Sequence, residues 1–189
     1  MGRMFVAALV GAVLMFIWGF VSHTVLKLFD VKGFSNSGGL VEMLKTSQAE
    51  SGVYAVPAMP EDMSDKESPQ YKKFVDDYEK GPIAIVIYQE EGATFMGAMT
   101  FIKGFLVMLA SCLFAAFLVS RSKLASTGGR FTFVLCLGVL MAIHVDGSNW
   151  AWMYHPMGWT IAAMIDHVAA WAAAGVGIAL ILRPQVVVR

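Results

Sequence analysis

The residues of this chain that could do chemistry are ionisable side chains within or beside long apolar stretches. Lys103 lies inside one such stretch and Asp166 inside another, and histidines lie in or next to three of them. A charged side chain is costly inside a bilayer, so each is a candidate functional residue by default. The predicted intramembrane polar cluster consists of His23, Lys103, His144, Asp146, Asp166 and His167.

Lys103 and Asp166 are predicted to lie at matching depths. At about 1.5 Å per residue, Lys103 is about 9 Å below the outer end of its stretch, and Asp166 is about 12 Å below the outer end of its own. We therefore expect the two side chains to face each other, as an ion pair or through a water. The alternative is that Lys103 extends its ammonium group to the outer headgroups.

Histidines together with a carboxylate are metal-ligand chemistry, which makes His23, His144 and His167 weak candidates for a metal site. A strong signal would be two histidines four residues apart on one helix, and the sequence has no such pair. Asp166 and His167 are adjacent, about 100° apart on a helix, so they cannot readily face one ion. We predict no metal site and no haem, and interhelical hydrogen bonds for these side chains instead.

Catalytic sequence motifs do not occur in this chain. It has no nucleophile elbow, no HExxH, no P-loop and no Cys-x-x-Cys. Both cysteines, Cys112 and Cys136, lie in apolar stretches and are interpreted as small buried residues. We therefore predict no catalytic residue and no resident cofactor.

Aromatic residues are dense between the third and fourth apolar stretches. Tryptophan and tyrosine favour the headgroup zone, where the ring can be dry and its N–H or O–H wet. The predicted outer aromatic loop is therefore either an interfacial belt or a surface that stacks on a bound lipid, quinone or pigment. Its members are Trp150, Trp152, Tyr154, His155 and Trp159.

The elements that must position these residues are four apolar stretches. Of the 189 residues, 57% are hydrophobic and 15% are charged, against about 45–50% and about 25% in soluble domains. Each stretch is long enough to cross a bilayer or nearly so, which predicts an all-α membrane protein with an antiparallel bundle of four transmembrane helices. It also excludes a soluble enzyme, a disordered chain and a nucleic-acid binder. The predicted helices are 4–26, 97–119, 131–147 and 158–182.

The short loops predict the orientation. Arg121, Lys123 and Arg130 flank the connection between the second and third stretches, whereas the connection between the third and fourth has no Lys or Arg. The positive-inside rule then places both termini in the cytoplasm and residues 30–96 outside, periplasmic or extracellular. The first stretch is interpreted as an uncleaved anchor, because it is longer than a signal-peptide core and lacks a good cleavage site.

Stripes of small residues predict which helix faces meet. In the fourth stretch the stripe includes Asp166, which we therefore expect to face inward. In the first stretch a similar stripe ends at His23, for which we expect the same. The stripes are Ala162, Asp166, Ala169, Ala170, Ala173 and Gly177, and Ala8, Ala12, Gly19 and His23.

Residues 30–96 are predicted to form a small α+β insert. A short helix is expected over 40–47, a strand over 53–56 and a second strand over 83–88. Between the strands, Ser68-Pro69 is typical of a helix start, and Gly81-Pro82 ends that helix. Two strands make a thin core, so we expect the insert to rest on the bundle or on a partner.

Several segments resemble a family of small bacterial four-helix integral membrane proteins with an insert between their first two helices. The resemblance implies a multi-pass protein of the bacterial inner membrane and adds weight to this layout, but it implies no reaction, substrate or cofactor. His155-Pro156 departs from the family pattern, so no role carries over to His155. The segments are 11–23, Gly52-Val53-Tyr54 with Pro57, Gly81-Pro82 with Tyr88, and Asn149-Trp150 with Tyr154, Pro156, Asp166 and Trp171.

Three functional hypotheses follow from the residues. The first is a non-enzymatic accessory or scaffold subunit that docks against other membrane protein subunits in a larger complex. The second is a lipid-, quinone- or pigment-binding module that uses the aromatic loop with His144, His155 and Asp166. The third is a metal-dependent or proton-handling enzyme or a transporter, centred on His23, Lys103, Asp166 and His167. We expect the first, with membrane lipids and other subunits as partners.

Overall fold

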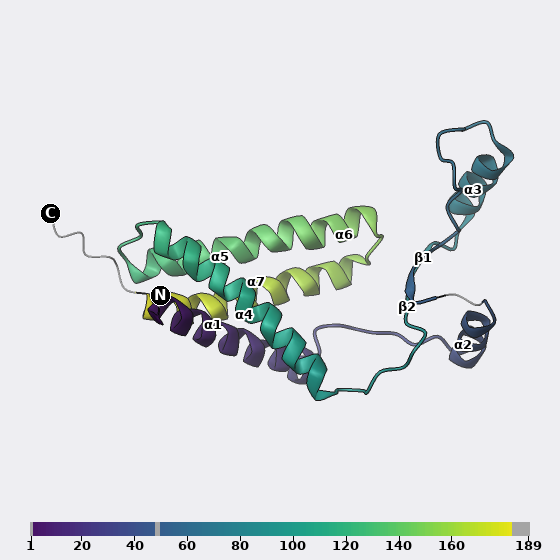
Figure 1. Ribbon diagram of the computed structural model, residues 1–189. Coiled ribbons are helices and arrows are strands. Elements are labelled where there is room, and N and C mark those ends of the chain that lie inside the picture. Colours follow the sequence, from purple (N-terminus) through teal and green to yellow (C-terminus); the bar gives the residue numbers. More distant parts are fainter. Residues whose placement is uncertain (1, 48–49, 183–189) are drawn as a thin grey trace. The chain divides into compact units, whose positions relative to one another are not determined.

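The computed structural model describes residues 2–47 and 50–182 and contains a bundle of long apolar helices (Figure 1). Its four long helices are apolar enough to span a membrane, which confirms the predicted number. Two of them contain a π-helical turn, η1 in the first and η2 in the third. The segments are α1 (Gly2–Phe20) with η1 (Val21–Val25), α4 (Ala98–Arg121), α5 (Thr127–Met141) with η2 (Ala142–Asp146) and α6 (Gly147–Trp152), and α7 (Met157–Ile181).

The third long helix extends further than predicted. Its expected end was residue 147, followed by an aromatic loop, but the helix continues through η2 and α6 to Trp152. The polar run Gly147-Ser148-Asn149 lowers the hydropathy there without interrupting the backbone hydrogen bonds. Trp150 and Trp152 therefore lie on a helix, and only residues 153–156 connect it to α7.

Helix α7 lies at the centre of the bundle, packed on α1 and on α5, while α4 packs chiefly on α1. Small residues allow the close approach: a Cβ on Gly177 would lie 3.1 Å from the backbone N of Gly11. This confirms that the stripe on α7 faces another helix at Gly177. On the other side of α7, Trp171 packs over Gly138 of α5.

One of the two cysteines was interpreted wrongly. Cys112 is buried where α4 meets the core, as expected, but Cys136 is exposed. Val134 and Gly138 occupy the face of α5 that packs on α7. Cys136, two residues from each, therefore points to the opposite side of the helix.

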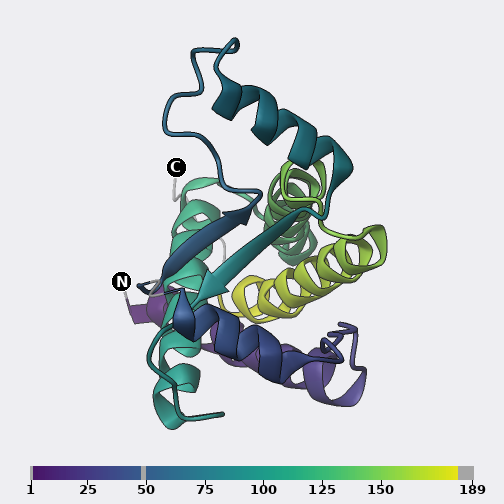
Figure 2. The same cartoon turned by 90° about the vertical axis from the view of Figure 1, so that its right-hand side faces the viewer.

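Residues Lys32–Phe95 form a separate compact unit. It contains a two-stranded antiparallel sheet, drawn side by side in Figure 2, with Val53 opposite Ile87 and Ala55 opposite Ile85. This confirms the predicted small sheet. The elements are α2 (Ser37–Thr46), β1 (Gly52–Val56), α3 (Pro69–Lys80) and β2 (Ala84–Tyr88).

Local capping explains where the insert's helices begin and end. The Ser68 side chain accepts a hydrogen bond from the Tyr71 N–H at 3.1 Å, so α3 starts where the sequence predicted. Gly81 ends it with a φ of 67°, a left-handed conformation that favours glycine. Helix α2 begins three residues before its predicted start, because the Asn36 side chain caps the Gly39 N–H.

The insert has no buried core. Of the described residues between 32 and 95, none is buried, whereas α1, α4, α5 and α7 each contribute buried side chains. Its charged groups form local surface contacts, such as the Asp76 carboxylate beside Lys80, which raises the pKa of that lysine. The unit is therefore held by backbone pairing and local polar contacts.

Candidate functional site

A hydrogen bond within the bundle joins Trp18 of α1 to Asp166 of α7. The indole Nε1 donates to Asp166 Oδ1 at 2.8 Å, and both side chains are half-buried. Asp166 therefore faces a neighbouring helix, as its place in the small-residue stripe suggested. Its partner, Trp18, was not among the predicted site residues.

The predicted direct ion pair between Lys103 and Asp166 does not occur. Among the described residues, the ion pairs do not include these two side chains, and Lys103 is exposed. The reason is the order of the helices. Helix α4 packs on α1 and barely touches α7, so α1 supplies the partner that α4 was expected to provide.

A second polar contact joins Asp146 of η2 to His167 of α7. Oδ2 of Asp146 lies 2.7 Å from Nδ1 of His167, and the Asp146 side chain is only 5% exposed. The contact joins η2 to α7 within the bundle.

Two polar side chains of the predicted cluster lie on the third long helix. Residues two positions apart on a helix are about 200° apart, so these two side chains face opposite sides. Asp146 is buried within η2, whereas His144, two residues earlier, is exposed. The two members of the predicted cluster on this helix therefore face different surroundings.

The expectation that His23 faces inward was wrong. Its side chain is exposed and folds back on its own helix, with Nδ1 3.0 Å from the Gly19 carbonyl and 2.9 Å from Ser22 Oγ. Ser22 is the buried residue of η1. A Cβ on Gly19, the preceding member of the stripe, would meet no atom within 4 Å, so the stripe has already left the helix contact before η1 begins.

Three members of the predicted cluster, Asp146, Asp166 and His167, take part in two contacts that lie side by side on α7, whereas the other three are exposed. Adjacent Asp166 and His167 point to different partners, one on α1 and one on η2, as their separation around the helix indicated. Within residues 2–47 and 50–182, no group of three or more histidine, cysteine or acidic side chains is arranged to hold a metal ion. The arrangement suits interhelical hydrogen bonding.

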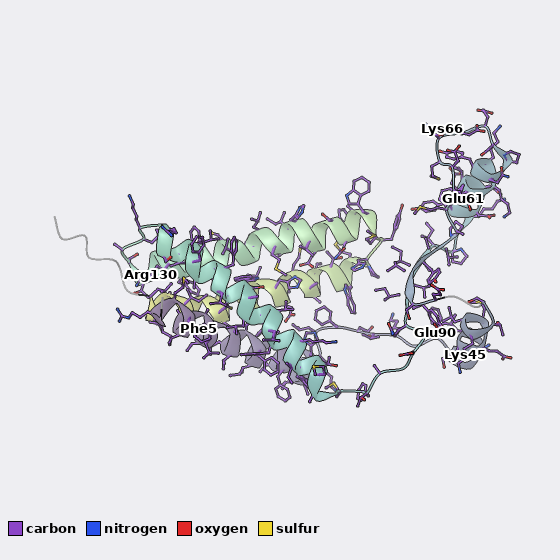
Figure 3. The ribbon with its side chains drawn as sticks, in the orientation of Figure 1. Phe5, Lys45, Glu61, Lys66, Glu90 and Arg130 are labelled. Atoms are coloured by element: carbon purple, nitrogen blue, oxygen red, sulfur yellow. The ribbon has the colours of Figure 1, made fainter. Side chains whose placement is uncertain are left out.

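Sequence reasoning treated Arg130 only as an indicator of orientation. The structure buries it to 5% exposure at the α4–α5 end of the bundle (Figure 3). Nε donates to the Ala179 carbonyl of α7 at 3.2 Å, and Nη1 donates to the Ala125 carbonyl at 2.9 Å. A cation suits the carboxyl end of a helix. In the sequence, the one sign of this buried role was the position of Arg130 at the start of an apolar stretch.

The predicted aromatic residues do not form a single surface. Trp159 packs on Phe29 with ring centroids 4.8 Å apart, and Phe29 in turn lies 5.0 Å from the His23 ring. Trp150, Trp152 and Tyr154 are exposed, and His155 is half-buried. Amphipathic rings exposed at a helix end are typical of an interfacial belt.

The insert carries a different candidate surface, which we call the apolar ribbon. It is one face of the β1–β2 sheet, where directly opposite residues lie on the same side. Val53 is 72% exposed and Ile87 is 83% exposed. Exposed apolar patches of this kind mark interaction sites. The ribbon consists of Val53, Ala55, Ile85 and Ile87.

Comparison with known proteins gives no further assignment. No family model, curated protein or solved structure matches this chain. The resemblance to small bacterial four-helix membrane proteins stays a prediction from the residues, and function must be argued from the geometry above.

Proposed function

We propose that this chain is a non-enzymatic accessory subunit of a larger complex in a bacterial inner membrane. In this proposal the four long helices span the membrane, both termini are cytoplasmic, and residues 30–96 lie on the outer side. The insert docks on a partner subunit through the apolar ribbon. The polar contacts of α7 keep the anchoring bundle together.

The absence of buried residues in the insert's described part carries this proposal. Ordering one residue's backbone costs about 1–2 kcal/mol of conformational entropy, and burial of apolar side chains is the main term that offsets it. A two-stranded sheet is marginal by itself in water. A surface that covers Val53 and Ile87 would supply the missing burial.

The charges near the bundle's short connection support the proposed orientation. Arg121 and Lys123 are exposed there and can meet cytoplasmic headgroups. Arg130 is engaged with backbone carbonyls instead and contributes less to this argument. Cysteine labelling of intact cells at positions 65 and 125 tests the orientation: we expect label at 65 and none at 125.

Site-specific photo-cross-linking tests the docking. A photoreactive residue at position 87 should give a defined adduct with another membrane protein in native membranes. The same residue at exposed position 66, labelled on the insert in Figure 3, serves as the matched control and should give no such adduct. Adducts from position 87 only to lipid, or only within the chain itself, would contradict the proposal.

Assembly size provides an independent readout. After gentle detergent extraction, the wild-type chain should migrate in a large complex. The Ile87→Ser variant should leave that complex while the Lys66→Ser control stays in it. A wild-type chain that runs as a lone monomer would contradict a subunit role.

A further inference from the structure

A shallow apolar groove lies between α1 and α4. It is an open groove of about 370 Å³, and no polar atom lines it. Phe16 of α1 lies edge-on to Phe101 and Phe105 of α4, with ring centroids 6.4 and 5.9 Å apart. The lining residues are Phe16, Phe101, Ile102, Phe105 and Leu106.

A lysine lies beside this groove without an anionic partner. Lys103 follows the lining residue Ile102 and precedes Leu106 by three positions, a spacing that makes it Leu106's neighbour on the helix surface. It is exposed, and among the described residues no carboxylate lies within ion-pair distance of it. Its positive charge is therefore available to a ligand.

The direction of the lysine side chain fits a headgroup. Long side chains on a helix point toward its N-terminus. We therefore expect the ammonium group of Lys103 to be directed to the Ala98 end of α4, which is about 7.5 Å away along the axis. In a spanning helix that end lies at the membrane surface, where a lysine stem crosses apolar territory and its charge reaches the headgroups.

We propose that Lys103 and the α1–α4 groove form a binding site for an anionic phospholipid. Lys103 contacts the phosphate and an acyl chain fills the groove over Phe16, Phe101 and Phe105. Charge complementarity selects the occupant: a singly charged cation beside a wholly apolar groove favours a net-negative headgroup over a zwitterionic one. The inference rests on the proposed span of α4 and is independent of the insert's partner.

Native mass spectrometry of the purified full chain tests the site. The delipidated protein is titrated with phosphatidylglycerol and with phosphatidylcholine carrying the same acyl chains. We expect an about fivefold preference for phosphatidylglycerol, the ratio for one lysine near a charged headgroup. Lys103→Gln should abolish that preference, whereas Lys123→Gln, the matched control in the α4–α5 connection, should keep it.

A second variant separates the groove from the charge. Phe105→Ala should weaken binding of both lipids and leave their ratio unchanged. Equal binding of the two lipids by the wild-type chain, or an unchanged preference in Lys103→Gln, would overturn the site. Loss of the wild-type chain from alkaline-washed membranes would instead overturn the span of α4, and the site with it.

Discussion

The bundle and the insert place their polar and apolar side chains in opposite ways. In the bundle, polar groups such as Asp146 and Asp166 bond to neighbouring helices, while apolar residues such as Phe114 and Leu180 face outward. In the insert, lysines and aspartates of α3 pair on the surface, and Val53 and Ile87 of the apolar ribbon are exposed. The first arrangement suits lipid as the surrounding solvent, whereas in the second the apolar ribbon is not buried by the insert's own residues.

This contrast predicts where mutations will act. In the bundle, side chains at helix contacts should determine stability, because neighbouring helices leave little space around them. In the insert, substitutions in the ribbon should change assembly and leave the stability of the chain almost unaltered. The following predictions sharpen or break that contrast.

The largest effect is expected at the α1–α7 contact. Gly177→Leu would place its Cβ 3.1 Å from the backbone N of Gly11, so the helices must separate. We expect a loss of about 3 kcal/mol in the free energy of unfolding, measured by denaturant titration in mild detergent. Gly104→Leu on α4, whose Cβ would meet no atom within 4 Å, is the control and should be nearly neutral.

The next effect is expected at the Asp146–His167 contact. His167→Leu would leave a buried carboxylate without its partner, which should cost about 2 kcal/mol in the same titration. His144→Leu removes an exposed histidine on the neighbouring helix and should cost little. Equal losses from both variants would show that the contact does not hold the bundle.

A smaller effect is expected between Trp18 and Asp166. A double-mutant cycle with Trp18→Phe and Asp166→Ala should give a coupling energy of about 0.6–1.7 kcal/mol, the range of interhelical hydrogen bonds in membranes. The parallel cycle with Lys103→Gln and Asp166→Ala should be additive, because those side chains do not pair. Coupling in the second cycle alone would restore the original ion-pair hypothesis.

The smallest effect on stability is expected in the apolar ribbon. Ile87→Ala should change the unfolding free energy of the isolated chain by at most about 0.5 kcal/mol, because the side chain is 83% exposed. Hydrogen exchange of β2 measures the same local stability. A loss of 2 kcal/mol or more would show that Ile87 is buried in the isolated chain and would remove the contrast.

Much of the fold could be predicted because its signals are local. Hydropathy and length gave the long helices, and Ser68, Pro69 and Gly81 delimited α3 through capping and a left-handed turn. The helix over Gly147–Trp152 was missed because polar residues lower hydropathy without ending a helix. The hydropathy of a segment indicates whether it lies in an apolar environment, but it does not indicate where the backbone hydrogen bonds of a helix end.

The partner predicted for Asp166 was wrong. Depth along each helix follows from counting residues, and this placed Asp166 among other polar groups. Its actual donor, Trp18, depends on α1 lying next to α7, and that neighbour relation is a long-range packing outcome. Arg130 was missed for the same reason, since its acceptor Ala179 is 49 residues away.

The π-helical turn at Ala142–Asp146 has a consequence for how this segment is compared with other sequences. It shifts the angular phase of the helix, so a helical wheel drawn continuously from Thr127 to Trp152 assigns the residues after the turn to incorrect sectors. Two wheels, one ending at Met141 and one restarting at Gly147, describe the segment. Alignments of this segment should place an insertion or deletion of one residue within the turn, where it changes the phase and keeps both flanking helices intact.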